Sequence, residues 1–592
     1  MIENRMIEDR SDRRIAIDAI GLLQTFNVAD VLTAADVHVA QRLGVLIGES
    51  NDIVLLAAAL AVRAVRHGSV CVDLTTVADT PIDNDGVEVD LPWPDPQTWL
   101  AAVAASPLVS EEAMRLSDSL LYLDRYWREE RQVCHDLLAR LDGPTPAVDE
   151  DLLAAALDRV FPPDYVEQRT IAESSVRRGT TVLTGGPGTG KTTTVARLLA
   201  IIAEQHEHLY GRAPRIAMCA PTAKAAARLT EAVAEQSREL QPVDQDRLGA
   251  IAASTLHRLL GARWGSTRFA HDRNHRLPHD VIVVDETSMV SLTHMARLLE
   301  AVRPTARLVL VGDADQLASV EAGAVLADVV AGLAEHPAQP VARLLHGHRF
   351  GGPIETLADA LRVGDADAAL AVLTAGHPQV QLIDPNDVAS VEAFTADVVD
   401  HAVAVWSAAE AGNAAGALES LDAHRLLCAH RDGPFGVRGW NARIERLLAD
   451  RTSVAPYAEW YPGRPVLVTA NNHALGIYNG DIGITIRTSD GRMAVALATS
   501  DEPRQLAITR LPDTDTLYAM TVHKAQGSQA GVVSVIMPPE DSTLLTRELF
   551  YTAVTRAQEQ VRIVGTQASI RAAIDRRAVR ASGLAERLRA GL

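Results

Sequence analysis

One stretch, residues 181–194, restricts the fold of this chain more than any other: Thr-Val-Leu-Thr-Gly-Gly-Pro-Gly-Thr-Gly-Lys-Thr-Thr-Thr. Strand-forming residues lead into a glycine-rich turn, and an alanine- and leucine-rich run follows it. From Gly185 to Thr192 the stretch fits G-x-x-x-x-G-K-[ST], the phosphate-binding P-loop. Glycines let backbone N–H groups surround an anion, and the N-terminus of the next helix attracts it. The stretch therefore predicts a strand, a nucleotide-binding loop and a helix, in that order.

The side chains of the P-loop have expected tasks in binding ATP. Lys191 would reach the β- and γ-phosphates, and the hydroxyl of Thr192 would bind Mg²⁺. The predicted ATP-binding residues of the loop are Gly185, Gly186, Pro187, Gly188, Thr189, Gly190, Lys191, Thr192 and Thr193. Gln168 precedes the strand in a predicted helix, where its amide could read adenine as donor and acceptor together. A surface glutamine is the alternative for that residue. ATP and Mg²⁺ are the predicted cofactors.

Two further apolar runs end in polar residues and predict buried parallel strands. Residues 279–289 carry four apolar strand formers followed by Asp285 and Glu286. Asp285 would hold Mg²⁺ through water, and Glu286 would polarise the attacking water. Residues 307–317 form the next such run, and Gln316 near its tip could sense the γ-phosphate. Alternating strands and helices predict a parallel sheet with the site at the carboxyl ends of its strands.

Lysine is scarce in this chain, and its positions are informative. Lys and Arg total 56, yet only Lys191, Lys224 and Lys524 are lysines. A lysine in a chain that otherwise uses arginine indicates a place that needs a compact ammonium group. The alternative is that these three lysines are present by chance. Lys224 lies in a predicted strand–turn–helix segment, residues 215–229, where it could hold a nucleic-acid phosphate.

The same scarcity argues against a nuclease site in this chain. A restriction-type nuclease needs a carboxylate two residues before its catalytic lysine. The residues at those positions are Thr189, Thr222 and Val522, and none is acidic. Any exonuclease activity is therefore expected from a partner subunit.

Composition sets broader limits. A chain of 592 residues predicts several domains, and its net charge of −20 argues against holding nucleic acid by bulk positive charge. A local basic groove or a basic partner stays compatible with that charge. Four widely spaced cysteines without a C-x-x-C pair argue against zinc or iron–sulfur sites and fit a reducing cytoplasm. No apolar run has the length of a membrane span, and the charged N-terminus, starting at Met1 or Met6, is no secretory signal.

Residues 1–163 carry no catalytic signature and predict a mostly helical domain. Five aromatic residues could be core side chains of that domain or anchors of a protein interface: Trp93, Trp99, Tyr122, Tyr126 and Trp127. A basic, histidine-rich excursion at residues 263–279 could contact nucleic acid, with a solvated loop as the alternative. Neither region decides the activity.

The second half of the chain adds further candidates. Residues 348–430 are alanine-rich and helical, with Arg349 near their start, and residues 471–515 contain Asn-Gly and Asp-Gly turns that predict a small β-barrel. Arg556 ends an aromatic and apolar helical turn, where a buried guanidinium could point at a phosphate. The arginine-rich tail, residues 570–592, predicts one helix with a solvated face.

Taken in order, these segments resemble superfamily 1 helicases over residues 164–565. The matching runs are the P-loop, Ala-Pro-Thr-Ala-Lys224, Val-Asp-Glu286, Val-Gly-Asp-Ala-Asp-Gln316, Thr-Val-His-Lys-Ala-Gln-Gly527 and Tyr-Thr-Ala-Val-Thr-Arg556. Three runs are similar to those of RecD-like proteins: the P-loop sequence, the Val-His-Lys-Ala-Gln-Gly run and Ala-Leu-Gly-Ile-Tyr-Asn-Gly-Asp-Ile-Gly483. The N-terminal region has the length and alanine-rich helix expected of the RecD subunit of the RecBCD helicase–nuclease.

The resemblance implies a fold and a domain plan. The fold is α/β, with two RecA-like parallel-sheet P-loop domains, ATP between them, and an SH3-like β-barrel inserted in the second. Residues 1–163 would be a helical partner-interaction domain and residues 164–347 the first RecA-like domain, with a small insertion at about 263–279. Residues 348–592 would be the second RecA-like domain, with the barrel at about 471–515.

The resemblance also assigns roles to residues. Lys191, Thr192, Asp285 and Glu286 would hydrolyse ATP, Gln316 would couple hydrolysis to DNA, and Gln168 would read adenine. Arg349 and Arg556 would be arginine fingers. The residues that match positions lining the DNA track are Pro221, Thr222, Lys224, Thr255, His257, Thr521, His523 and Lys524.

The leading hypothesis is an ATP-dependent helicase that moves 5′ to 3′ on single-stranded DNA, with polarity implied by the resemblance alone. It would act on duplex ends in double-strand break repair, as a RecD-like subunit bound to RecB-like and RecC-like partners. The alternatives are a stand-alone RecD-like helicase, a non-catalytic ATP-binding regulatory subunit, and a motor on RNA.

Overall fold

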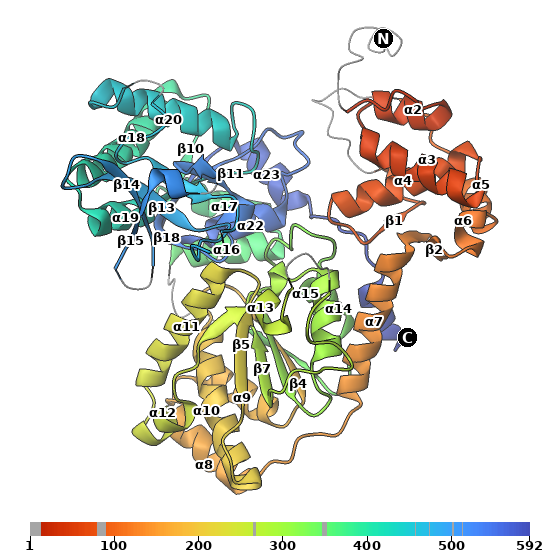
Figure 1. Cartoon of the computed structure of the whole chain (residues 1–592), viewed down its shortest axis with the longest axis horizontal. Coiled ribbons are helices and arrows are strands. Elements are labelled where there is room, and N and C mark those ends of the chain that lie inside the picture. Colours follow the sequence, from red (N-terminus) through yellow and green to blue (C-terminus); the bar gives the residue numbers. More distant parts are fainter. Residues whose placement is uncertain are drawn as a thin grey trace.

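The computed structural model describes residues 14–79, 90–263, 268–345, 352–455, 458–472, 474–499, 502–511 and 513–591. Figure 1 shows three bodies: an N-terminal unit, a body around one parallel sheet, and a body around a second. In these ranges no helix has both the length and the apolar character needed to cross a membrane.

A six-stranded parallel sheet forms the centre of the first P-loop body. Its strands lie in the order β6-β5-β7-β8-β4-β9, and each neighbouring pair is parallel. Their bounds are β4 Thr180–Gly185, β5 Ile216–Ala220, β6 Ala253–Thr255, β7 Val281–Val284, β8 Arg307–Gly312 and β9 Val341–Leu344. Strands buried on both faces need unbroken apolar runs, which explains the Val-Ile-Val-Val sequence of β7.

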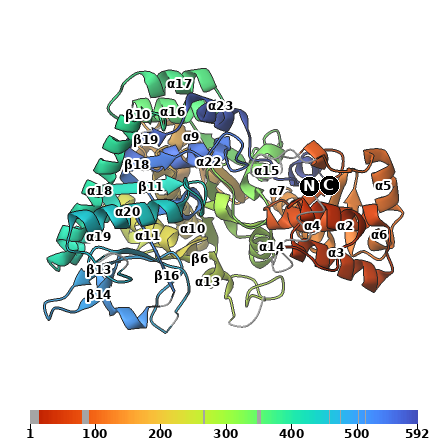
Figure 2. The same cartoon turned by 90° about the horizontal axis from the view of Figure 1, so that it is seen from above.

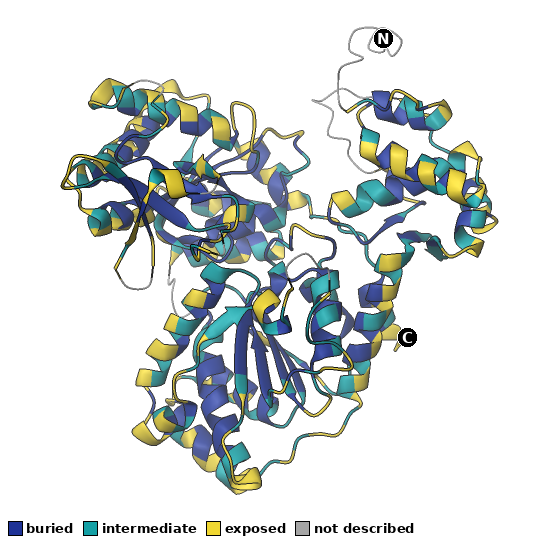
Figure 3. Ribbon diagram, viewed as in Figure 1, coloured by how far each residue is buried: buried dark blue, intermediate teal, exposed yellow. Residues whose placement is uncertain are grey.

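Two helical layers cover this sheet, and Figure 3 shows its strands buried between them. Val281 and Val283 belong to the apolar cluster of the layer α8–α12, whereas Ile282 and Val284 belong to the cluster on the other face. The first layer consists of α8 Glu150–Val160, α9 Val166–Val176, α10 Lys191–Tyr210, α11 Ala223–Arg238 and α12 Pro242–Leu248. The other contains α7 Asp124–Leu141, α13 Leu256–Leu260, α14 Leu292–Ala301 and α15 Val325–Gly332, with the short 3₁₀ helix η2 Thr287–Met289 beside them. Because α8 packs in this core, the body begins before residue 164.

The second body contains a five-stranded parallel sheet in the order β10-β19-β18-β11-β17. Its strands are β10 Val380–Ile383, β11 His424–Cys428, β17 Ala519–Thr521, β18 Ala530–Ile536 and β19 Ala557–Val564. Its helices are α16 Pro353–Val363, α17 Ala366–Thr374, α18 Val388–Glu410, α19 Ala414–Ala423, α20 Val437–Arg451, α21 Val522–Ala525, α22 Arg547–Val554 and α23 Gln567–Asp575. The chain is thus α/β, with two parallel sheets.

An antiparallel sheet is inserted between β11 and β17. Its order is β15-β14-β13-β12-β16, from β12 Pro465–Val468, β13 Ile482–Arg487, β14 Met493–Leu497, β15 Arg504–Ala507 and β16 Thr514–Thr516, with η3 Ile508–Arg510 after β15. Among the described residues β15 does not pair with β16, so the pairing is that of an open sheet. A closed barrel at residues 471–515 stays a prediction.

The N-terminal unit packs helices around a small antiparallel sheet in the order β1-β3-β2. Its elements are α2 Gly21–Val28, α3 Ala34–Ile47, α4 Asp52–Arg66, η1 Val77–Asp79, α5 Pro96–Ala104, α6 Pro107–Ser110, β1 Cys71–Asp73, β2 Met114–Ser117 and β3 Leu120–Leu123. Trp99 and Tyr122 are fully buried, as core residues are. The long helix α7 then joins this unit to the first P-loop body, where it packs on α14.

The C-terminal tail does not form the single solvated helix expected at residues 570–592, so that prediction was wrong. α23 packs on the second body, and the chain then returns to the first body, where α24 Leu584–Ala590 lies against α15 and α7. Figure 2 shows this end beside α7 and α15. Leu584 and Leu588 are buried, because their spacing of four residues places both on the helix face that meets α15.

Candidate ATP and DNA site

The P-loop joins β4 to α10 with the backbone that its glycines allow. Gly188 and Gly190 have φ of +82° and +83°, a conformation that strains other residues. A Cβ on Gly185 would lie 2.7 Å from the carbonyl oxygen of Leu344, so this position requires glycine too. The Lys191 ammonium donates to the carbonyl oxygens of Gly185 at 2.7 Å and Gly186 at 2.8 Å. The lysine therefore lies along the loop, where it could turn to phosphate oxygens.

Asp285 and Glu286 follow β7 directly, at the carboxyl edge of the first sheet. The amide of Asp285 donates to the carbonyl oxygen of Cys219 at 2.8 Å, which aligns the end of β7 with β5. Burial, together with the neighbouring Glu286 carboxylate, raises the pKa of Asp285 to about 6. Glu286 has a φ of +49°, a left-handed backbone that is uncommon for a residue with a side chain. Such strain is often found at functional sites.

One cavity of about 340 Å³, the ATP cavity, brings the predicted catalytic residues together. The residues that were predicted from the sequence and that line this cavity are Pro187, Gly188, Gly190, Lys191, Thr192, Thr193, Asp285, Glu286, Gln316 and Arg556. The first body supplies all of these except Arg556, which follows α22 in the second body. Arg349 lies outside the described residues.

Arg556 is held tightly at its place in the wall. It is 4% exposed, and its guanidinium donates to the carbonyl oxygens of Thr552 at 3.1 Å and Ser528 at 3.4 Å. Burial lowers its pKa, while the nearby carboxylates of Glu286 and Asp313 oppose that effect. A buried guanidinium with few partners has donors left for an anion that enters the cavity.

Other lining residues were not found as site residues from the sequence, among them Arg228, Asp313 and Gln529. Arg228 donates to the carbonyl oxygen of Gly527 at 2.6 Å and to the Gln529 side chain at 3.3 Å, which joins the two bodies. Two signals could have pointed to them. Arg228 lies four residues after Lys224, on the same face of a helix. Asp313 directly follows an apolar strand, β8, as Asp285 follows β7.

A short loop after β8, residues 313–323 and here called the sensor loop, connects Gln316 to the second body. The Gln316 amide and the Tyr551 hydroxyl both donate to Oδ2 of Asp313, at 2.9 and 3.1 Å. The amide of Leu317 donates to the Thr552 hydroxyl at 2.8 Å, and Gln526 donates to the Leu317 carbonyl oxygen at 2.6 Å. Burial and the Asp313 carboxylate raise the pKa of Tyr551, so its hydroxyl keeps its proton.

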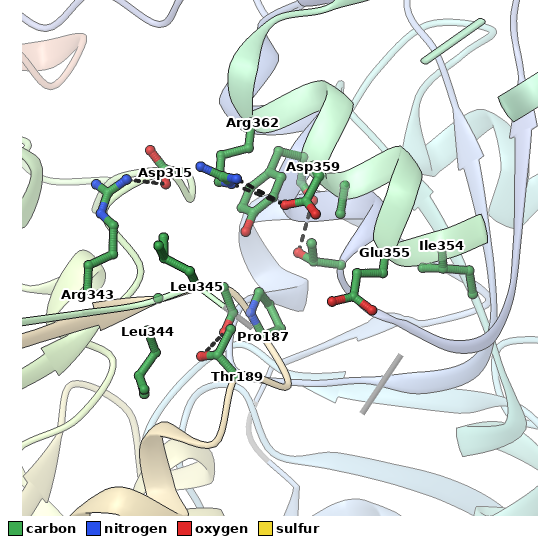
Figure 4. A pocket seen from close by; sticks show the side chains of 15 residues that line it. Pro187, Thr189, Asp315, Arg343, Leu344, Leu345, Ile354, Glu355, Asp359 and Arg362 are labelled. Atoms are coloured by element: carbon green, nitrogen blue, oxygen red, sulfur yellow. Dashed lines mark hydrogen bonds and ion pairs between the residues drawn. The ribbon is translucent and has the colours of Figure 1, made fainter. Parts of the chain in front are cut away.

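The opposite side of the P-loop borders a smaller pocket against α16, drawn in Figure 4. Gly185, Gly186, Pro187 and Thr189 line it from the loop. Figure 4 shows Arg362 beside Asp359 and Arg343 facing Asp315. These ion pairs have N–O distances of 3.1 Å and 3.8 Å, respectively.

Gln168 lies close to this loop as well. It is 1% exposed on α9, and its amide donates to the Thr189 carbonyl oxygen at 3.4 Å. It is therefore a buried partner of the P-loop and no surface residue. Recognition of adenine by Gln168 stays a prediction.

The candidate DNA residues lie at the carboxyl ends of strands in both sheets. Pro221, Thr222 and Lys224 follow β5. Thr255 is the last residue of β6, where it pairs with Ala220 of β5, and His257 follows it. In the second sheet, Thr521 is the last residue of β17, and His523 and Lys524 follow it. A Cβ on Gly527 would lie 3.6 Å from the Cβ of Ala225, so the loop after Lys524 contacts the start of α11.

The three threonines of this group share one local role, since each caps the helix that follows it. The hydroxyl of Thr222 accepts from the amide of Ala225, that of Thr255 from Arg258, and that of Thr521 from Lys524. Helix capping explains a threonine at these positions whether or not DNA binds.

The basic members of the group have perturbed surroundings. Burial, with help from the Arg425 charge, lowers the pKa of Lys224 to about 8. The Nε2 atoms of His257 and His294 are 3.0 Å apart, so one ring donates to the other. Burial lowers the pKa of His523, and the Arg580 charge adds to that effect. Lys524 forms an ion pair with Asp515 at 3.4 Å.

The described ranges contain no group of three or more His, Cys, Asp and Glu side chains placed to hold a metal ion. A Mg²⁺ ion that comes with a nucleotide needs fewer protein ligands, because phosphate oxygens and water complete its shell. The Thr192 hydroxyl and the Asp285 carboxylate line the same cavity and are oxygen donors of the required kind.

A P-loop at the edge of one parallel sheet, with acids after a neighbouring strand and an arginine from a second parallel sheet, defines a P-loop NTPase with a nucleotide cleft between two bodies. Residues 168–322 match the family described as AAA domain, and residues 516–564 match the UvrD-like helicase C-terminal domain. Residues 28–122 match the RecBCD enzyme subunit RecD, N-terminal domain.

The chain belongs to the RecD subunits of RecBCD enzymes. It is 56% identical over 580 residues to the RecBCD enzyme subunit RecD of Mycobacterium tuberculosis (strain ATCC 25618 / H37Rv), with 98% of each chain covered. It is also 56% identical over 574 residues to RecD of Mycolicibacterium smegmatis, with 96% of this chain and 99% of that one covered.

More distant proteins are similar over less of their length. The chain is 31% identical over 498 residues to the ATP-dependent RecD2 DNA helicase of Deinococcus radiodurans, covering 82% of this chain and 61% of the relative. A crystal structure of Bacteroides Pif1 bound to ssDNA is similar with a TM-score of 0.37 at 16% identity, over 68% of this chain and 93% of that chain.

Proposed function

We propose that this chain is an ATP-dependent DNA helicase and single-stranded DNA translocase that acts as the RecD motor subunit of a RecBCD-type complex. One observation carries the proposal: a single cavity collects Lys191, Asp285 and Glu286 from the first body and Arg556 from the second. Hydrolysis at such a cavity depends on the relative position of the two bodies. Family membership then supports double-strand break repair and recombination as the process it serves.

The residues of the cavity divide the chemistry of ATP hydrolysis among them. Lys191 neutralises charge on the β- and γ-phosphates, and Glu286 orients the attacking water. Thr192 and Asp285 would hold Mg²⁺, which neutralises phosphate charge when it is bound. Arg556 stabilises the charge that develops on the transferred phosphoryl group, and Gln316 lies where it could sense that group. Arg349 is proposed as a second arginine finger on the basis of the resemblance alone.

Single-stranded DNA would cross the carboxyl edges of both sheets. Lys224 and Lys524 would contact phosphates, and the loops that carry His257 and His523 would line the track. Contacts of this kind recognise backbone and give little sequence preference. Opening and closing of the cleft would move the strand, 5′ to 3′ according to the resemblance.

The other assignments follow from this activity. We propose an N-terminal partner-binding unit, a first RecA-like domain and a second one with the antiparallel insertion in SH3-like form. RecB-like and RecC-like subunits would be the partners, and nuclease activity would belong to them. A protein that acts on chromosomal DNA would work in the cytoplasm of its cell.

A stand-alone helicase is the alternative. The RecD subunit of Mycobacterium tuberculosis is 56% identical to this chain, whereas the RecD2 helicase is 31% identical. The higher identity favours the subunit role.

The test measures ATP turnover of the full chain, alone and co-expressed with its neighbouring subunits, with and without single-stranded DNA. Lys191→Gln should lower DNA-stimulated turnover by at least about a hundredfold. Arg212→Gln is the matched control, because Arg212 pairs with Asp280 away from the cavity and should leave turnover unchanged. Stimulated turnover that survives Lys191→Gln would refute the motor and favour a regulatory subunit.

Unwinding of duplexes that carry a 5′ or a 3′ tail tests polarity. Unwinding only from 3′ tails would refute the proposed direction. A monomer that unwinds DNA without partners would favour the stand-alone helicase, and equal activity on RNA tails would overturn the assignment to DNA.

A further inference from the structure

The last segment of the chain, residues 576–590 and here called the strap, contacts all three bodies. It leaves α23 on the second body, and α24 ends on the first body beside α15 (Figures 1 and 2). On the way it meets the N-terminal unit: the amide of Val70 donates to the Ala581 carbonyl oxygen at 2.8 Å, and the amide of Ala581 donates to the Ser69 hydroxyl at 3.2 Å. The strap is therefore placed to transmit movement among the three bodies.

Arg580 is the strap residue that contacts the sensor loop. Its Nη1 donates to the carbonyl oxygens of Ser319, Glu321 at 3.1 Å and Gly68 at 3.5 Å. Gly68 has a φ of +86°, and a Cβ there would lie 2.8 Å from the Arg580 guanidinium carbon. The amide of Gly323 donates to the Gly68 carbonyl oxygen at 2.9 Å, so Gly68 is bonded to the same loop. The guanidinium thus joins the sensor loop to the N-terminal unit.

The sensor loop is held from two directions. Its first half, Asp313 to Leu317, accepts and donates hydrogen bonds to Tyr551, Thr552 and Gln526 of the second body. Its second half is closed by the Ser319 hydroxyl, which donates to the Glu321 carbonyl oxygen at 2.8 Å, and is then clamped by Arg580. Gln316 lies in the first half, between Asp313 and Leu317, and is three residues before Ser319, where the Arg580 clamp begins.

A cavity of about 510 Å³ lies beside this clamp, and Leu317, His523 and Arg580 line it together with residues of the N-terminal unit. His523 belongs to the candidate DNA track, and the Arg580 charge contributes to lowering its pKa. Arg580 is therefore close to the DNA track as well as bonded to the loop that carries Gln316.

We propose that Arg580 is a positioning residue that clamps the sensor loop to Gly68, so that the strap keeps Gln316 aimed into the ATP cavity and couples DNA binding to hydrolysis. This inference rests on the proposed helicase function. Without the clamp, the loop from Leu317 to Glu321 loses its fixed carbonyl contacts and Gln316 samples orientations away from the nucleotide. ATP binding itself is untouched, because Arg580 contacts neither the P-loop nor Lys191.

The first test compares two arginines of the strap in the full chain. Arg580→Gln should lower the stimulation of ATP turnover by single-stranded DNA about fivefold or more, with the KM for ATP unchanged. Arg580→Lys should recover part of the stimulation, since an ammonium still donates to carbonyl oxygens. Arg587→Gln is the matched control: Arg587 anchors the strap to Glu130 at 3.0 Å and does not contact the loop, so stimulation should stay at the wild-type level.

The second test changes Gly68, the partner of Arg580 in the clamp, and therefore does not depend on how Arg580 variants fold. Gly68→Ala places a methyl group against the guanidinium and should reproduce the loss of stimulation. Gly48→Ala is its control, because Gly48 has a similar φ of +85° in the same unit and no atom within 4 Å of an added Cβ.

The outcomes separate the two proposals. If Arg587→Gln loses stimulation as Arg580→Gln does, the strap is only a structural brace and the inference is overturned. It is also overturned if both Arg580→Gln and Gly68→Ala keep wild-type stimulation. If the wild-type chain, alone and in its complex, shows no stimulation by DNA, the helicase function fails and this inference fails with it.

Discussion

The first P-loop body and the second body meet at two seams of different chemistry. At the ATP cavity they contact each other through polar groups, among them Tyr551 on Asp313, Thr552 on Leu317 and Arg228 on Gly527. At the strap, the chain from the second body is held on the first by Leu584 and Leu588, which are 0% and 2% exposed in the core with α15 and α7. The first seam surrounds the ATP cavity, whereas the second buries these two leucines in an apolar core.

The apolar strap seam is harder to separate than the polar seam at the cleft, because the two depend on different interactions. Each hydrogen bond of the cleft contributes about 1 kcal/mol net, because water replaces the lost partner when the cleft opens. A buried leucine contributes about 2 kcal/mol or more, and water offers it no substitute. The leucines of the strap seam therefore resist separation more strongly than the hydrogen bonds of the cleft, where Leu317 is the sensor-loop residue that packs in the apolar core of the second body.

The largest effect is expected at the cleft from Arg556→Gln. Removing the only charged group that the described part of the second body contributes to the ATP cavity should lower kcat for ATP about a thousandfold. ATP binding should persist, since Lys191 and the P-loop are unchanged. Steady-state turnover and nucleotide binding, measured on one preparation, separate the two.

Arg562→Gln provides the control for this change. Arg562 also lies on the second body but pairs with Asp397, away from the cavity. If Arg556→Gln kept more than about a tenth of wild-type turnover, ATP hydrolysis would not depend on the arginine that the second body contributes to the cavity.

The second largest effect is expected at the strap from Leu588→Ala. The change leaves a hole in the core between α24 and α15 and should lower the free energy of unfolding by about 2–4 kcal/mol. Chemical denaturation measures it. Leu46→Ala, at a leucine that is 65% exposed, should change that free energy by less than about 0.5 kcal/mol.

In contrast to Arg556→Gln, Leu588→Ala should leave kcat of the folded enzyme close to wild type. A large fall in kcat with little loss of stability would mean that the strap seam also belongs to the catalytic cycle, and the contrast between the seams would disappear.

The two seams also differ in how far the sequence predicts them. The first-body wall of the cleft was predictable because each part is a contiguous run: a glycine-rich loop before a helix, or an apolar strand ending in acids such as Asp285 and Glu286. Local chemistry and local structure coincide in such runs. The first parallel sheet followed from the same alternation of strands and helices, whereas the second was implied by the resemblance alone.

The strap was misread because its signal is not local. Leu584 and Leu588 are four apart among arginines, which predicts an amphipathic helix but does not show which body it packs against. Tyr551 was missed for a similar reason. Its partner Asp313 lies 238 residues earlier, and no pattern in either run specifies that pairing. The exact form of the antiparallel insertion depends likewise on pairing between distant strands.

A smaller effect at the cleft is expected from Tyr551→Phe. It removes one of the two donors to Oδ2 of Asp313 and keeps the ring, so DNA-stimulated turnover should fall about fivefold while the fold persists. Tyr122→Phe is the same change at the strap seam, where the hydroxyl donates to Glu130 at 3.1 Å. It should alter thermal stability and leave turnover unchanged. Equal effects of both changes on turnover would contradict the division between the seams.

The smallest effect is a pH dependence that Asp328 gives to the strap seam. This α15 residue lies near Ser582, Glu130 and Glu586, and burial together with both glutamates raises its pKa to about 7 while Ser582 opposes the shift. Because the folded pKa is above the ordinary value, the neutral form stabilises the seam. That stabilisation is fully present below about pH 4 and is lost as the pH rises through about 7. Asp328→Asn keeps the neutral form at every pH, so its Tm should match that of wild type below about pH 4 and exceed it by a few degrees near about pH 8. Thermal unfolding at several pH values measures this, and Asp367→Asn, at an exposed residue, is the control. A Tm difference that does not change between those pH values would show that ionisation of Asp328 does not weaken this seam.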